Sequence, residues 1–281
     1  MRAQLIDRLD ELERFAALAR VAPWLALDTE FVRDRTYFPR PGLIQIATPE
    51  QTALVDPVQL KSLAPLEALL FDSDALKILH AASQDLELFV VLFNRVPQPL
   101  FDTQKAAALL DLAPQIGYAA LAETLLGAPP GAALGRYNWL KRPLAEQALE
   151  YAAEDVAHLG RMRDLLSARL ETEGRTAEFA EAMLQNADAE RYRPHPERAW
   201  KRIRAARKLD DTALSRLKPL AAWREEQAMR EDRPRQWILR DNALAALARL
   251  APQSDAELAR TDLLRPAEHR RYGAKLIELL A

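Results

Sequence analysis

Two acidic residues lie two positions apart inside an apolar stretch near the start of the chain. The stretch LALDTEFV, residues 25–32, places Asp28 and Glu30 among residues typical of a buried strand. Side chains two apart on a strand share a face and lie about 7 Å apart, so these carboxylates would be neighbours. Two poorly hydrated anions repel each other, and Mg²⁺ or Mn²⁺ would offset that cost. The pair predicts a metal site, and a solvated strand end is the ordinary alternative.

Two further acids and a tyrosine are candidates for the same site. Asp85, in HAASQDLELF, falls at the start of an expected helix, where an acid could simply stabilise the helix N-terminus. Asp155, in EYAAEDVAHL, follows Tyr151 by four residues, a spacing that puts both side chains on one helix face. That pair would also suit a helix packed in a core. Nuclease metal sites are assembled from distant segments, so the four acids could form one cluster.

Apolar periodicity indicates the elements that would position these residues. Three strands in a meander, followed by helix, strand, helix and strand, predict an α/β fold with a mixed sheet flanked by helices. The expected strands are residues 24–32, 42–48, 52–57, 75–82 and 98–103, and the expected helices are residues 59–71, 83–94, 103–112 and 144–170. Residues 1–20 predict an amphipathic helix, not a signal peptide, and residues 127–143 predict a surface loop.

Composition and charge narrow the class of protein. The 281 residues include no cysteine, which excludes disulfides and thiolate metal sites, and no apolar run approaches the ~20 residues of a membrane span. We therefore expect a cytoplasmic protein. Residues 1–190 carry 18 Lys and Arg against 28 Asp and Glu, whereas residues 191–281 carry 21 against 13. An acidic part suited to cations is thus joined to a basic part suited to phosphate, unless the difference is ordinary surface variation.

Five separated segments, taken together, resemble the DEDD family of 3′ to 5′ exonucleases and, more narrowly, ribonuclease D. They are LALDTEFVRDRTYFPRPGLIQIA, KILHAASQDLELF, FDTQKAA, WLKRPL and YAAEDVAHL. The later segment LKPLAAWREEQAMREDRPRQWILRDNALAALARLAP resembles the helical HRDC domain of ribonuclease D and RecQ helicases. The resemblance implies a ribonuclease H-like exonuclease domain over residues 1–190, a basic linker over residues 191–208 and a small all-α HRDC-type nucleic-acid-binding domain over residues 209–281.

The resemblance also implies roles for the acidic residues. Asp28 and Glu30 match the first exonuclease motif, Asp85 the second, and Asp155 with Tyr151 the third. The four carboxylates would hold two divalent ions, Mg²⁺ or Mn²⁺, and Tyr151 would orient or help to deprotonate the attacking water. The tyrosine four residues before the last aspartate places the chain in the tyrosine class, since Glu150 occupies the position of the histidine in the other class.

Other residues in the same motifs are candidates for substrate contacts. Phe31 could stack on the terminal base, although a core role suits it equally. Gln84 and His80 could line the cleft, and Arg142 could bind a phosphate. Asp102 is a fifth acid in a motif-like place, and a helix N-cap explains it.

The resemblance implies a 3′ to 5′ exoribonuclease that trims tRNA precursors and other structured RNAs with single-stranded 3′ ends, releasing nucleoside 5′-monophosphates. No segment indicates a membrane or an obligate protein partner. Two alternatives are a DNA exonuclease of the same superfamily and an RNA-binding protein that has lost the reaction. All five expected active-site positions are filled, which argues against the second alternative.

Overall fold

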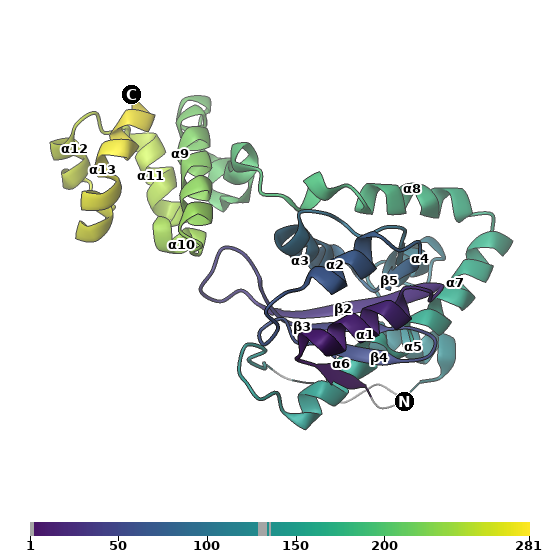
Figure 1. The fold of residues 1–281 in the computed structure, drawn as a ribbon. Coiled ribbons are helices and arrows are strands. Elements are labelled where there is room, and N and C mark those ends of the chain that lie inside the picture. The colour runs from purple at the N-terminus through teal and green to yellow at the C-terminus, as the bar shows by residue number, and fades with distance from the viewer. Residues whose placement is uncertain (1–2, 129–133, 135) are drawn as a thin grey trace. The chain divides into compact units, whose positions relative to one another are not determined.

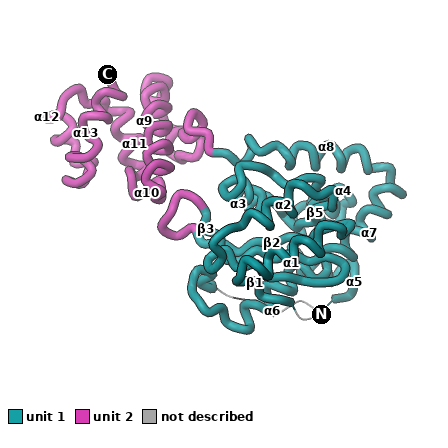
Figure 2. Tube along the Cα trace, in the orientation of Figure 1, with its two compact units in different colours: residues 1–32, 39–193 teal, residues 33–38, 194–281 magenta. Residues whose placement is uncertain are grey.

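The computed structural model describes residues 3–128, 134 and 136–281. The chain forms two compact units, which we call the sheet unit and the helical unit (Figure 2). The sheet unit comprises residues 1–32 and 39–193, and the helical unit comprises Arg33–Phe38 together with Pro194–Ala281. No helix in the described part of the chain is both long enough and apolar enough to cross a membrane.

A six-stranded mixed sheet organises the sheet unit, and Figure 1 labels its strands β2, β3, β4 and β5. The strand order is β1-β4-β3-β2-β5-β6. Pairs β2–β3 and β3–β4 are antiparallel, and pairs β1–β4, β2–β5 and β5–β6 are parallel. The mixed α/β sheet expected from the sequence is confirmed, including the meander of its first three expected strands. The strands are β1 (Gln4–Ile6), β2 (Trp24–Val32), β3 (Arg40–Ala47), β4 (Thr52–Val55), β5 (Leu76–Leu79) and β6 (Leu100–Asp102).

Helices pack on the sheet through two hydrophobic clusters. Leu43 and Leu54 of the sheet pack with Ala148 and Ala152 of α6, whereas the alternate strand residues enter a larger core shared with most other helices of the unit. This division follows from the two-residue alternation of a strand, which sends neighbouring side chains to opposite faces. The helices are α1 (Leu9–Ala19), α2 (Ala64–Phe71), α3 (Ser83–Phe93), α4 (Thr103–Leu109), α5 (Tyr118–Leu126), α6 (Glu146–Ala157), α7 (Leu159–Thr172) and α8 (Thr176–Asn186).

The start of the chain differs from the expected single amphipathic helix over residues 1–20. Gln4–Ile6 form β1, which pairs in parallel with β4 at the edge of the sheet, and α1 begins only at Leu9. Ile6 is fully buried, so its apolar side chain serves the core as a strand residue. The apolar spacing alone could not separate these three residues from the helix that follows.

The helix expected over residues 144–170 is divided into α6 and α7 at His158. The Tyr118 hydroxyl donates to the Glu154 carbonyl and accepts the His158 N–H, at 2.6 and 3.1 Å. The Tyr118 hydroxyl therefore takes the place of the hydrogen bond that a continuous helix would form between the His158 N–H and the Glu154 carbonyl. A side chain inserted into the helical ladder is an established cause of such a break.

The helical unit contains residues that were expected to be a linker. Two short 3₁₀ helices, η2 (Pro196–Arg202) and η3 (Arg204–Lys208), bury Ala199, Ile203 and Ala206 in the core of the unit. The segment 191–208 is therefore mostly part of the folded unit, because its apolar residues at spacings of four and three form an inward face. The remaining elements are η1 (Ala189–Tyr192) in the sheet unit, and α9 (Asp211–Arg230), α10 (Arg235–Ile238), α11 (Asp241–Leu250), α12 (Asp255–Arg260) and α13 (Pro266–Leu280) in the helical unit.

The short segment between β2 and β3 also belongs to the helical unit. Tyr37 is 6% exposed and lies in the hydrophobic core of that unit. Its hydroxyl donates to Glu225, which also accepts two bonds from Arg235. The backbone N–H groups of Tyr37 and Phe38 both donate to Asp232 at 3.0 Å. Residues separated by about 190 positions thus complete one helical core.

Candidate active site

Three carboxylates from β2 and α6 meet at one place. Asp28, Glu30 and Asp155 each offer an oxygen within 4.8 Å of the others, and all three residues are partly exposed. Strand alternation puts Asp28 and Glu30 on the sheet face that α6 covers, opposite Gln45 and Leu43 of β3. The structure therefore brings together three of the four acids expected at the site.

The fourth acid, Asp85, lies beside this cluster and is held by a hydroxyl group. Asp85 is 7% exposed in the first turn of α3, and Thr29 of β2 donates to its Oδ1 at 2.5 Å. Thr29 points away from the face that carries Asp28 and Glu30, so Asp85 reaches β2 from the other side. The charge of Asp85 nevertheless raises the pKa of Asp28 and Glu30, which shows that all four carboxylates interact.

Burial raises the pKa of all four acids, and repulsion by the other cluster acids adds to the rise for Asp28 and Glu30. Desolvation is the main cause in each case: it raises the pKa of Glu30 to about 8, that of Asp85 to about 7 and that of Asp155 to about 6. The pKa of Asp28 also lies well above its usual range, because burial adds to the charges of Asp85, Asp155 and Glu30. Such a cluster is costly in the ionised state unless a cation joins it.

The donor set fits a hard divalent cation. Carboxylate oxygens are the ligands that Mg²⁺ and Mn²⁺ prefer, and three of them converge here without a thiol or imidazole among them. Metal binding requires the ionised carboxylates and therefore releases protons from groups whose pKa is raised.

These pKa shifts predict an inverse pH dependence of stability for the metal-free protein. A carboxyl group whose pKa is higher in the folded chain favours folding while it remains protonated, and this contribution is lost as pH rises. We expect the unfolding temperature in EDTA to fall from about pH 4.5 to about pH 8, the interval between the ordinary and shifted pKa of Glu30. Thermal denaturation followed by circular dichroism would measure this.

The control for that experiment is Glu30→Gln, which removes one of the shifted groups. Its metal-free unfolding temperature should fall less steeply with pH than that of the unaltered protein. Saturating Mg²⁺ should reduce the slope in the unaltered protein by neutralising the cluster. Equal slopes for the two proteins in EDTA would contradict the assigned origin of the pH dependence.

Tyr151 lies on α6 one turn before Asp155. Its hydroxyl lies close enough to the Asp155 carboxylate to counteract part of the rise in the pKa of that acid, and burial together with the neighbouring acids raises the pKa of Tyr151. The Trp139 ring, 5% exposed, lies 6.5 Å from the Tyr151 ring and packs the preceding loop against α6. The tyrosine is thus a protonated donor with a restricted ring, placed against a cluster carboxylate.

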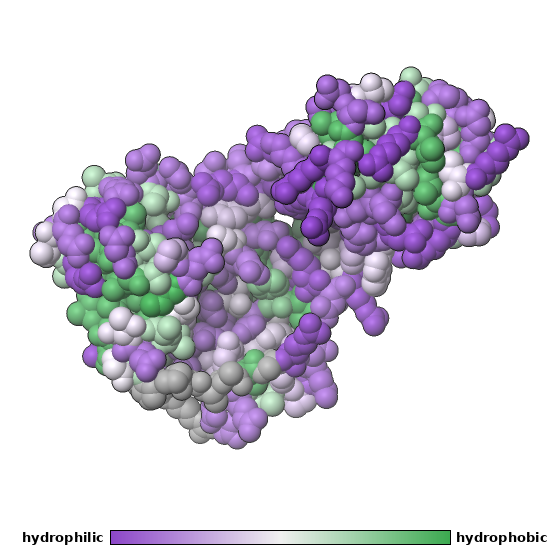
Figure 3. All heavy atoms as spheres, turned by 180° about the vertical axis from the view of Figure 1, so that it is seen from behind, coloured by the Kyte–Doolittle hydropathy of each residue, from purple (hydrophilic) through white to green (hydrophobic). Residues whose placement is uncertain are grey.

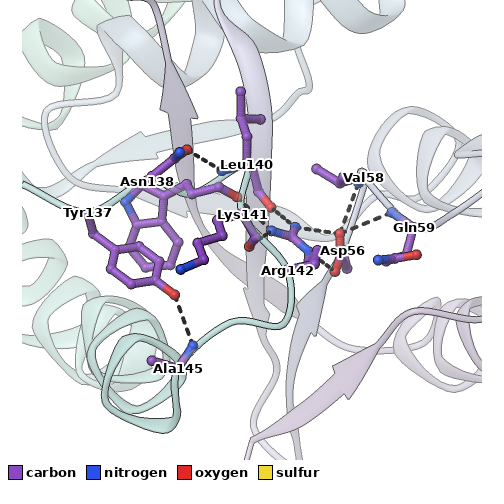
Figure 4. Close-up of polar contacts among 11 residues, drawn as sticks. Asp56, Val58, Gln59, Tyr137, Asn138, Leu140, Lys141, Arg142 and Ala145 are labelled. Carbon is purple, nitrogen blue, oxygen red and sulfur yellow. Dashed lines mark hydrogen bonds and ion pairs between the residues drawn. The ribbon is translucent and has the colours of Figure 1, made fainter.

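Arg142 has a structural role that differs from the expected phosphate contact. Its guanidinium binds the buried Asp56 through two nitrogens and donates to the carbonyl groups of Gly42, Trp139 and Lys141 (Figure 4). These acceptors fasten the loop that precedes α6 to β3 and to the end of β4. Because all of its donors are engaged by the protein, the arrangement favours a structural role for Arg142 over the expected phosphate contact.

The packing of this loop also explains Gly42. A Cβ atom at position 42 would lie 2.5 Å from the Cβ of Trp139, well inside van der Waals contact. Glycine therefore lets the chain around Trp139 pass closely over β3.

His80 is likewise engaged within the protein. One ring nitrogen lies 2.8 Å from the Thr103 hydroxyl and the other 3.0 Å from the Ile116 carbonyl. Burial lowers the pKa of His80, which favours the neutral ring. The histidine therefore ties β5 to the region around α4, and the structure does not support its expected substrate contact.

Two other substrate candidates remain predictions. Gln84 is exposed in the first turn of α3, next to Asp85. Phe31 is partly exposed at a register shift directly after Glu30, and it belongs to none of the hydrophobic clusters formed by the described residues. This placement favours the base-stacking interpretation of Phe31 over a core role.

Asp102 is the N-cap of α4, as the sequence indicated, and it also fixes the turn before α3. Its buried carboxylate accepts the N–H groups of Gln104 and Lys105 in α4 and those of Ala81 and Ala82. Ala81 has a positive φ of 55°, and the two hydrogen bonds from the N–H groups of Ala81 and Ala82 to Asp102 stabilise this conformation. Asp102 thereby helps to position the helix that carries Asp85.

Sequence reasoning did not identify Thr29 and Gln45, the two polar partners of the cluster. Thr29 binds Asp85, and Gln45 donates to Asp28 at 3.3 Å. Each could have been recognised in the sequence as a polar residue within an otherwise apolar strand. The alternation of side chains along the strand places each of them on a face that an acid approaches.

A mixed sheet that brings partly buried carboxylates together beside a helix-borne tyrosine is typical of a metal-dependent phosphodiester nuclease. In agreement, the model of a 3′-5′ exonuclease family matches residues 3–171, and the model of the HRDC domain matches residues 213–280.

The chain is also similar to individual proteins over most of its length. Ribonuclease D of Pseudomonas paraeruginosa is 39% identical over 268 residues, which cover 93% of this chain and 69% of that protein. Ribonuclease D of Escherichia coli is 37% identical, and its crystal structure superposes with a TM-score of 0.89 over 100% of this chain and 74% of that one. Brucella melitensis NrnC with bound Mg²⁺ matches 64% of this chain and 86% of its own, with 26% identity and a TM-score of 0.54.

The chain belongs to the ribonuclease D family. It is a hydrolytic 3′ to 5′ exoribonuclease, and its family uses divalent metal ions. The chain spans 64% to 74% of the length of its curated relatives.

Proposed function

We propose that this exoribonuclease trims the 3′ ends of tRNA precursors and other structured RNAs, releasing nucleoside 5′-monophosphates. The observation that carries the chemistry is the convergence of Asp28, Glu30 and Asp155 within 4.8 Å, with the Tyr151 hydroxyl on Asp155. The substrate class rests on similarity to the E. coli protein, whose structure is described as that of an exoribonuclease involved in structured RNA processing.

The carboxylates would divide the work of holding metal. Asp28, Glu30 and Asp155 would hold one ion, and Asp28 together with Asp85, which Thr29 holds in place, would act on the second. When bound, two Mg²⁺ or Mn²⁺ ions would lower the pKa of the attacking water and stabilise charge on the attacking and leaving oxygens.

Tyr151 would orient the attacking water. The hydroxyl lies against Asp155, and the packing of Trp139 limits movement of the phenol ring. A group held in this way reduces the orientational freedom that the water must lose before attack. Phe31, partly exposed directly after Glu30, would stack on the 3′-terminal base.

The helical unit would hold the RNA backbone through its positive charge. Arg33–Phe38 and Pro194–Ala281 together carry 21 Lys and Arg against 14 Asp and Glu, a net charge of +7, and hydrophilic side chains cover much of the visible face of the unit (Figure 3). Trp237 is 48% exposed with the Arg233 guanidinium 5.8 Å from its ring, a combination suited to an unpaired base. Binding of this kind carries little sequence information and weakens with salt.

Digestion of a tRNA precursor with a short 3′ extension, labelled at its 5′ end, tests this function. We expect shortening from the 3′ end with Mg²⁺ or Mn²⁺, none with EDTA, and accumulation near the mature 3′ end. A DNA strand of the same sequence is the comparison for the alternative substrate. Faster digestion of DNA, or digestion of unstructured RNA alone, would contradict the tRNA assignment.

A further inference from the structure

Gln45 is a fully buried amide in the middle of β3. Its side chain is 0% exposed and lies on the same sheet face as Leu43, where α6 packs on the sheet. In the antiparallel pair β2–β3, Gln45 lies directly opposite Asp28, and its Nε2 donates to Asp28 Oδ2 at 3.3 Å.

The other end of this amide has no partner within the described part of the protein. Gln45 Oε1 is buried and receives no hydrogen bond there. A buried acceptor without a donor costs stability, whereas an apolar residue of similar size would suit the packing beside Leu43. The amide therefore costs stability if it serves the sheet alone, and its one side-chain hydrogen bond among the described residues is to a carboxylate of the cluster.

We infer that Gln45 is a positioning residue for Asp28 and tunes the affinity of the site for divalent metal. The inference rests on the metal-dependent exoribonuclease activity described above. Asp28 is the carboxylate assigned to both ions, so its orientation affects both. The Nε2 donor restrains one oxygen of Asp28 and so fixes the direction in which the carboxylate presents its lone pairs.

The neutral charge of the amide is part of this role. A lysine or arginine at position 45 would also restrain Asp28, but its positive charge would repel the metal ions. Glutamine donates a hydrogen bond without neutralising the cluster. Partners that hold metal ligands in this manner commonly change metal affinity 10- to 100-fold when they are replaced.

The test is Gln45→Met, which keeps the length and approximate volume of the side chain and removes the donor. Mn²⁺ binding to the RNA-free protein would be measured by isothermal titration calorimetry, and the Mg²⁺ concentration for half-maximal activity would be measured separately. We expect Mn²⁺ affinity to fall about 10-fold or more, and the Mg²⁺ midpoint to rise correspondingly. Much of the rate should return at saturating metal.

The matched control is Ile46→Ala on the neighbouring position of β3. Ile46 is also 0% exposed but faces the other side of the sheet, where it pairs with Leu27. Ile46→Ala should have a lower unfolding temperature than the unaltered protein and the same Mg²⁺ concentration for half-maximal activity. Gln45→Asn, which retracts the amide by one methylene, is the second variant should Gln45→Met fail to fold.

The outcomes separate this inference from the proposed function. Mn²⁺ affinity in a folded Gln45 variant equal to that of the unaltered protein would overturn the positioning role. An equal change in metal affinity in Ile46→Ala would also overturn it, because general loosening of β3 would then be sufficient. Absence of Mn²⁺ binding by the unaltered protein would instead refute the metal mechanism itself.

Discussion

Asp28→Asn is expected to reduce the rate of RNA digestion by about 10³-fold or more, since metal-ion stabilisation of a transition state is worth several kcal/mol. Asp28 interacts electrostatically with each of the other three carboxylates, because Asp85, Asp155 and Glu30 all raise its pKa. Asparagine keeps the shape of the side chain and removes its charge. The loss should therefore appear in metal binding and in turnover together.

The same substitution should stabilise the metal-free protein at pH 8. Removing one charge relieves the repulsion that raises the pKa of Glu30 and the other acids, so the unfolding temperature in EDTA should rise. Single-turnover digestion and thermal denaturation of one preparation would measure both effects. Asp72→Asn, at an exposed position of the same unit, is the control and should change neither. Undiminished digestion by Asp28→Asn would refute the carboxylate mechanism.

Tyr151→Phe is expected to lower the maximal rate by about 10²-fold while metal affinity changes little, as for other groups that assist proton transfer or water placement. The substitution removes only the hydroxyl beside Asp155 and leaves the ring packed near Trp139. Because the RNA and the metal ions would still bind, the defect should appear in turnover at saturating substrate and metal.

Tyr192→Phe is the matched control for this second effect. The Tyr192 hydroxyl donates to the Asn186 carbonyl outside the carboxylate cluster, and its removal also costs one hydrogen bond. The rate of RNA digestion by this variant should remain within about twofold of that of the unaltered protein, because one hydrogen bond near the surface contributes little to stability. A Tyr151→Phe enzyme with normal turnover but weakened Mn²⁺ binding would assign the tyrosine to metal binding instead.

Local sequence patterns were sufficient to predict contacts that follow from the regular periodicity of side chains along a strand or a helix. The alternation in residues 25–32 predicted that Asp28 and Glu30 share a face, and the four-residue spacing predicted that Tyr151 meets Asp155. The structure brings these residues together. Resemblance in separated motifs supplied Asp85, because its neighbourhood alone is equally typical of a helix N-terminus.

Contacts between distant segments could not be predicted in this way. Arg142 in a basic loop motif suggested phosphate binding, but its real partner, Asp56, is 86 positions away. Neither residue carries a local feature that indicates the other. The division of the helix at His158 had the same origin, because the hydroxyl that enters the ladder comes from Tyr118, 40 positions earlier.

The core of the helical unit is assembled from two segments that are far apart in the sequence, which constrains the order of folding on the ribosome. Tyr37 and Phe38 are synthesised long before their hydrogen-bond partners Glu225 and Asp232, which lie about 190 residues later in the chain. At about 5–20 residues per second, these aromatic side chains wait roughly 10–40 seconds for the remainder of their core. During that interval the nascent chain exposes apolar surface beside the strand that carries Asp28. The basic helical region without this early segment would therefore lack Tyr37 from its core, and a nascent chain stalled before α9 would be a target for chaperones and proteases.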